Sequence, residues 1–138
     1  MSPTRFFSIV AWILLPTVMF GGYSLLNLLI AGDVLTPFQV TFFRAGHAHA
    51  GVLLAVALLY HIYLDKTALT QRVRWAACAA WLAGALAVSG GFFLHMAVSR
   101  EGEGSVGTLI TTMGAIVLAL DSFLVAYGLI KAPREATL

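Results

Sequence analysis

The segment from Arg44 to Gly51 places two histidines, His47 and His49, beside a basic residue at the start of a strongly apolar run. Ionisable groups at membrane depth are costly to bury, so they are candidates for function. Neutral imidazole is also a common ligand of zinc, copper and haem iron. The alternative is that these side chains lie at a helix end and are hydrated among the lipid headgroups.

A third histidine, His95, ends a later apolar run, and we expect it at the same membrane level near the outer face. Three histidines at one level could hold a copper or zinc ion with an open coordination position. Two on neighbouring helices, His49 or His47 with His95, could instead be axial ligands of a haem. A regular helix turns His47 and His49 toward different sides, so they are not a simple chelate. The sequence predicts a cofactor site at His47, His49 and His95.

A second pair of polar groups, His61 and Asp121, lies deeper in the apolar sequence, toward the opposite side of the membrane. A buried carboxylate needs a partner. We therefore expect Asp121 to face the interior, with His61, Tyr60 or Tyr63 beside it. Such a pair could relay protons, or it could simply be a hydrogen bond that joins two helices.

Four apolar runs are long enough to position these groups, because a helix needs about 20 apolar residues to cross the hydrocarbon core. They cover residues 6–30, 42–64, 73–96 and 106–130. Short connections make neighbouring spans antiparallel. The predicted fold is an all-α, integral membrane, up-down four-helix bundle that forms one transmembrane domain over residues 1–138.

The composition excludes an ordinary soluble domain. The chain is 60% hydrophobic and 10% charged, with a mean hydropathy of +0.92, whereas soluble domains carry roughly 25% charged residues. The net charge of +2 does not indicate nucleic acid, because the basic residues flank the apolar runs. We expect the lipid bilayer as the main partner, with other membrane subunits or further copies of the chain as additional ones.

The distribution of Lys and Arg predicts the orientation, since cytoplasmic loops are enriched in these residues. Only Arg44 and Arg100 lie on one side, together with the acidic Asp33, Glu101 and Glu103. We expect that side to face outward and both termini to be cytoplasmic, in a membrane such as a bacterial inner membrane. The basic residues on the cytoplasmic side are Arg5, Lys66, Arg72, Arg74, Lys131 and Arg134.

Small residues recur at helical spacing in the third and fourth runs, which predicts close helix packing. In the first run, Pro16 and the pair Gly21-Gly22 predict a kink. The third-run stripe is Ala79, Ala83, Ala87, Gly91 and His95, and the fourth-run stripe is Gly107, Thr111, Gly114, Leu118, Asp121, Val125 and Gly128.

The GHAHAG segment, Gly46 to Gly51, resembles the histidine-bearing helices of the haem–copper oxidase superfamily. The size and four-span plan also resemble the MAPEG glutathione-dependent membrane enzymes. Neither resemblance assigns a family or adds a site residue. The sequence carries no GxSxG, HExxH, CxxC or phosphate-binding motif, so catalytic residues are unknown and enzymatic activity stays open.

Three functions follow from these patterns. The first is a redox or metal-binding membrane protein that holds haem, copper or zinc through His47, His49 and His95. The second is a non-catalytic subunit or assembly factor of a larger membrane complex. The third is a small proton-coupled transporter that uses Asp121 and His61.

Overall fold

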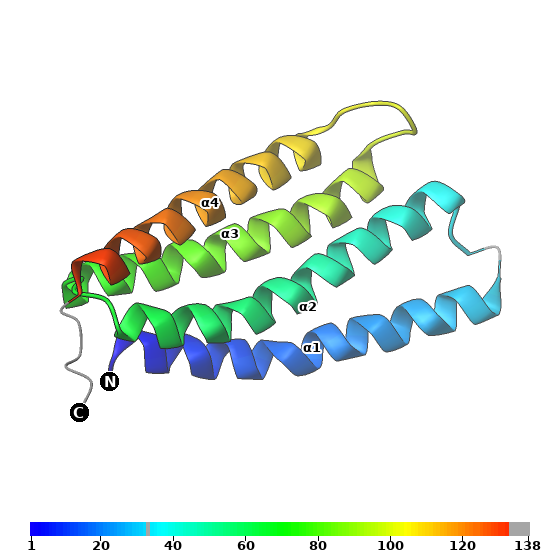
Figure 1. Cartoon of the computed structure of the whole chain (residues 1–138). Helices are drawn as coiled ribbons and strands as arrows, with labels where there is room; N and C mark the ends of the chain where they lie inside the picture. Colours follow the sequence, from blue (N-terminus) through cyan, green and yellow to red (C-terminus); the bar gives the residue numbers. More distant parts are fainter. Residues whose placement is uncertain (33, 133–138) are drawn as a thin grey trace.

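The computed structural model describes residues 1–32 and 34–132. It consists of four antiparallel helices, α1 (Pro3–Ala31), α2 (Pro37–Asp65), α3 (Gln71–Val98) and α4 (Val106–Lys131) (Figure 1). Each helix is long and apolar enough to cross a membrane. The predicted up-down bundle is therefore confirmed, and the chain is a small four-span membrane protein.

The two ends of the bundle hold different segments of the chain. The end where α1 begins and α4 ends is the terminal end, and the opposite end is the loop end (Figure 1). Which side of the membrane each end faces stays a prediction. Asp33 and Arg134, which entered the orientation argument, lie outside the described residues.

The helices follow one another in a row, with α3 as the most buried (Figure 1). In its most apolar window 44% of the residues are buried, against 11% for α1. Both α2 and α3 contact all three other helices, whereas α1 and α4 do not touch within the described ranges. The large apolar side chains of α1 are mostly exposed, as expected for a helix that faces lipid.

The second helix begins earlier than the sequence analysis predicted, at Pro37 instead of residue 42. The Thr36 side chain accepts a hydrogen bond from the backbone of Gln39, and the Gln39 side chain accepts one from the backbone of Thr36. This is a capping box, and proline suits the first helical position because its missing N–H needs no partner there. The predicted connection between the first two apolar runs, residues 31–41, therefore contains the first turn of α2.

The α3–α4 interface is built on glycine, and the predicted fourth-run stripe is its buried face. A Cβ atom at Gly114 would lie 2.8 Å from the Val88 nitrogen and 2.9 Å from the Gly84 oxygen, so the two backbones are in contact. The predicted third-run stripe was wrong in its first half. Ala79 and Ala83 are exposed, because this part of α3 turns its other side to α4.

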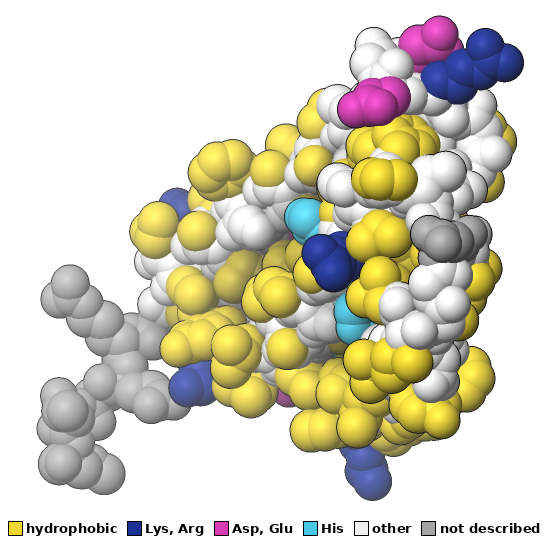
Figure 2. All heavy atoms as spheres, turned by 90° about the vertical axis from the view of Figure 1, so that its right-hand side faces the viewer, with side chains coloured by type: hydrophobic (Ala, Val, Ile, Leu, Met, Phe, Trp, Pro, Cys, Tyr) yellow, Lys and Arg dark blue, Asp and Glu magenta, His cyan; other side chains and the backbone are white. Residues whose placement is uncertain are grey.

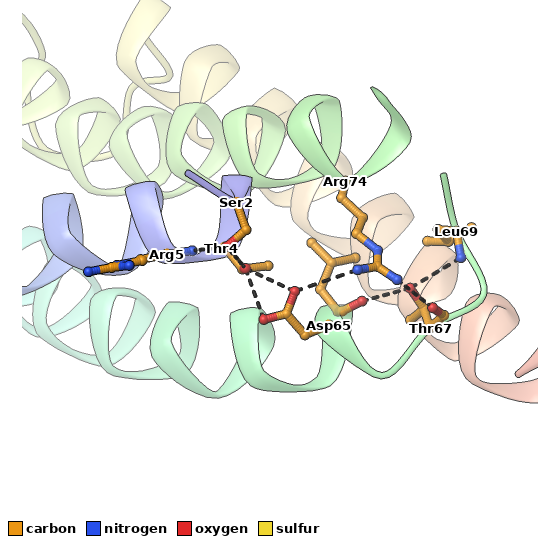
Figure 3. A network of polar contacts seen from close by, with 8 residues as sticks. Ser2, Thr4, Arg5, Asp65, Thr67, Leu69 and Arg74 are labelled. Carbon is orange, nitrogen blue, oxygen red and sulfur yellow. Dashed lines mark hydrogen bonds and ion pairs between the residues drawn. The ribbon is translucent and has the colours of Figure 1, made fainter. Parts of the chain in front are cut away.

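A polar network ties the helices together at the terminal end (Figure 3). The Thr4 hydroxyl of α1 lies 2.9 Å from both carboxylate oxygens of Asp65 on α2. Arg74 of α3 lies 3.6 Å from the same carboxylate and donates to the Thr67 carbonyl at 2.7 Å. The Ala68 nitrogen then donates to a carbonyl of α4. All four helices are thus connected at this end.

The far half of α1 has no comparable attachment. Its described side-chain hydrogen bonds to other helices come only from Thr4 and Ser8, in its first two turns. The helix runs through Pro16 without interruption. Beyond that point it is held by packing, which leaves space between α1 and α3.

Candidate functional site

His47 is half-buried and points from α2 toward α1. Its ring lies against the pair Gly21-Gly22, where a Cβ atom at Gly22 would come within 2.9 Å of the Nε2 atom. The glycine pair therefore makes room for the imidazole, a role that the sequence analysis did not assign to it.

His49 is exposed on a different side of α2. Its Nδ1 atom lies 2.7 Å from the carbonyl oxygen of Ala45, one turn earlier in the same helix. The ring lies beside Phe92 of α3, with 4.8 Å between the ring centroids. The predicted separation of His47 and His49 by helical geometry is thus present in the structure.

His95 is buried near the loop end, between α2 and α4. Its Nδ1 atom lies 2.8 Å from the Ser105 hydroxyl and 3.1 Å from that of Thr108. The ring packs on Phe42 at a centroid distance of 4.3 Å. These contacts hold the His95 ring against the start of α4.

The three histidines are not brought together. No group of three or more His, Cys, Asp or Glu side chains in the described part of the chain is placed to hold a metal ion. The loop-end face in Figure 2 likewise shows histidine side chains apart from one another, with a basic side chain between them. The space that a haem would need beside these histidines is taken by aromatic rings: Phe42 lies against His95, and Phe92 lies against His49. A porphyrin between these histidines would have to displace both rings, so haem binding would require these two side chains to rearrange.

Asp121 faces the interior, as predicted, and is only 5% exposed. The Tyr60 hydroxyl is its close neighbour, but no hydrogen bond joins them. Both Tyr60 Oη and Asp121 Oδ2 are buried without a hydrogen-bond partner among the described residues. The specific pairing of Asp121 with His61 is not formed, because His61 faces α1, and α4 does not reach that side.

His61 is 4% exposed, and its Nδ1 atom lies 3.0 Å from the Ser8 hydroxyl on α1. A serine hydroxyl can both donate and accept a hydrogen bond. It can therefore serve an imidazole whose Nδ1 carries a proton and one whose Nδ1 does not. Ser8 gives His61 a partner in either protonation state.

His61 also lines two cavities. One, of 140 Å³, lies at the terminal end and is lined by Thr4, Arg5, Ser8, Asp65 and His61. The other has a volume of about 10 Å³ and lies inside the seam of α1, α2 and α3. That is close to the minimum that holds one water molecule.

A third cavity continues the series toward the loop end. It has a volume of 260 Å³ and shares the lining residues Leu54, Leu82 and Ala85 with the small one. The lining includes Ser89, whose hydroxyl is buried without a hydrogen-bond partner in the described structure. A row of free spaces therefore follows the α1–α2–α3 seam, starting from a polar mouth beside His61.

The sequence analysis missed Ser8 and Ser89, although it found His61. Serines are frequent in membrane helices and usually bond to their own backbone, so residue type alone does not separate them. Helical spacing offers one signal for Ser8, because Thr4 lies one turn before it and both can face the same neighbour.

No protein family, no curated protein and no solved structure matches the chain.

Proposed function

We propose that this chain is a small proton transporter in which His61 takes up and releases the proton. The observation that carries the proposal is the position of His61 between the polar cavity at the terminal end and the internal cavity of the α1–α2–α3 seam. Ionisable residues inside membrane proteins often belong to proton relays. The mouth, where a proton would enter, holds the charged side chains of Asp65 and Arg5, and Asp65 is paired with Arg74 at 3.6 Å.

The seam beyond His61 is apolar and would act as a gate. Leu54, Leu82 and Ala85 lie where the small and the large cavity meet. Apolar constrictions in membrane pores block ions when dry and conduct when water enters. A proton would pass this stretch only while water transiently fills both cavities, which would keep the resting flux low.

Proton flux into liposomes tests the proposal. The purified full chain is reconstituted with a pH-sensitive dye inside, and acidification is followed under a potassium diffusion potential. We expect wild type to acidify the interior faster than empty liposomes, and His61→Gln to fall to their rate. Circular dichroism and gel filtration establish that the variant is folded. Equal rates for wild type and His61→Gln, or for wild type and empty liposomes, would exclude the function.

Haem or metal binding near the loop end is a second candidate function. It is favoured by the hydrogen bonds that hold the imidazole rings of His49 and His95. The Nδ1 atoms of His49 and His95 are both hydrogen-bonded within the protein. Metal-binding histidines are oriented by hydrogen bonds of this kind through the nitrogen that does not bind the metal. A visible spectrum and metal analysis after haem, copper and zinc supplementation test it. A Soret band or bound metal that is lost in both His49→Gln and His95→Gln would support it, and a colourless, metal-free protein would exclude it.

A further inference from the structure

The 260 Å³ cavity between α1, α2 and α3, through which the proposed proton path runs, carries an inference that goes beyond the proton function. Its lining contains no charged residue. An engineered apolar cavity of about 150 Å³ binds benzene, so this one has room for a substituted or fused ring. The cavity exists because small residues, Ala50, Ala85 and Gly90, line it where α1 is only loosely attached.

One polar group in this cavity lacks a partner. Ser89 is 6% exposed, and its hydroxyl has no hydrogen bond in the described structure. A serine in a membrane helix ordinarily donates to a carbonyl of its own preceding turn. The other hydroxyl in the lining, that of Thr17, does so by donating to Leu14 at 2.6 Å. Ser89 therefore has an unused donor and acceptor inside an otherwise apolar space.

The cavity is lined by Phe93 toward the loop end and bordered by exposed residues on its lipid side. The ring of Phe93 packs against Phe43 and against the backbone at Gly46. Leu86 and Gly90 line the cavity and are both exposed. A ligand would accordingly arrive from the lipid phase.

We infer that this cavity is a binding site for a neutral, lipid-dissolved ring molecule with a hydroxyl or carbonyl group that hydrogen-bonds to Ser89. A lipid acyl chain would fill the apolar walls but leave the Ser89 hydroxyl unpaired. Burying a polar group without a partner is costly, so the ring molecule with a polar group is the better occupant.

Two probes of similar size test the inference, 1-naphthol and 1-methylnaphthalene, which lacks the hydroxyl. Binding to the purified full chain in detergent is measured by the rise in unfolding midpoint, since a ligand of the folded state stabilises it. We expect 1-naphthol to raise the midpoint at a concentration roughly 2- to 10-fold lower than 1-methylnaphthalene needs, because it adds one net hydrogen bond. Ser89→Ala should abolish this difference while retaining binding of both probes.

A second variant blocks the site without disturbing the packing. A Cβ atom at Gly90 meets nothing within 4 Å, so Gly90→Leu can place its side chain at the cavity and should abolish binding of both probes. His61→Gln should bind both as wild type does, which separates this inference from the proton function. The proposed site is excluded if neither probe binds wild type, or if Gly90→Leu still binds them. It is also excluded if both probes bind wild type equally well, because that result would indicate a groove for lipid chains.

Discussion

The Nδ1 atom of His61 on α2 lies 3.0 Å from the Ser8 hydroxyl on α1, and both groups line the polar cavity at the terminal end. Ser8 and Thr4 are the two side chains through which α1 hydrogen-bonds to the rest of the described bundle. The Ser8–His61 contact therefore helps to attach α1 to the bundle. It does so at His61, a buried histidine that lines two of the cavities in the row.

Ser8→Ala should slow proton flux and lower the free energy of unfolding by about 1 kcal/mol, the usual net value of a hydrogen bond. Ser8→Thr keeps the hydroxyl and should retain most of the proton flux and most of the free energy of unfolding. Ser24→Ala is a matched control, because that hydroxyl bonds only to the Phe20 carbonyl of its own helix. If Ser8→Ala conducts like wild type, the hydroxyl has no part in the relay.

Ala85→Leu should close the gate. Ala85 is 5% exposed and lines both the small and the large cavity, so a larger side chain would fill space that water needs. We expect proton flux to fall to the rate of empty liposomes. Ala83→Leu, on the exposed side of the same helix, should leave the flux unchanged. Undiminished flux in folded Ala85→Leu would place the path elsewhere.

Gly22→Ala should displace the imidazole of His47, because the new Cβ atom would come within 2.9 Å of Nε2. Overpacking typically costs about 1–3 kcal/mol, and we expect the unfolding midpoint to fall. Gly21→Ala is the matched control, since its Cβ atom would lie at an ordinary 3.5 Å from Nδ1. Equal stability of the two variants would show that the glycine pair does not accommodate His47.

Asp121→Asn should leave proton flux close to wild type, because Asp121 is a residue of α4 and does not line the cavities of the seam between α1, α2 and α3. A neutral side chain of similar shape is cheaper to bury in a membrane than a carboxylate. Thermal unfolding should show a midpoint no lower than that of wild type. A folded variant without flux would instead make Asp121 part of the relay.

The fold was largely predictable from the sequence, since four apolar runs with short connections determine the bundle. The start of α2 at Pro37 was also predictable from the sequence, because Thr36 and Gln39 form a capping box around a proline at the first helical position. The inward direction of Asp121 followed from helical spacing.

The partners of the polar groups were not predictable in the same way. Helical spacing gives the face of a residue but not the rotation of its neighbours. His95, His47 and His49 share a membrane level in the sequence argument, yet they contact α4, α1 and α3 respectively. His61 and Asp121 are separated because α1 and α4 lie on opposite sides of the α2–α3 pair, which depends on the packing order of the helices.

The most direct test of the central claim is a glutamine scan of the four histidines in the liposome flux assay. His61→Gln alone should fall to the rate of empty liposomes, while His49→Gln and His95→Gln should stay at the wild-type rate. His47→Gln should stay close to wild type, because His47 lies beyond the gate, near the loop end. Wild-type flux in His61→Gln, with folding intact, would contradict the account.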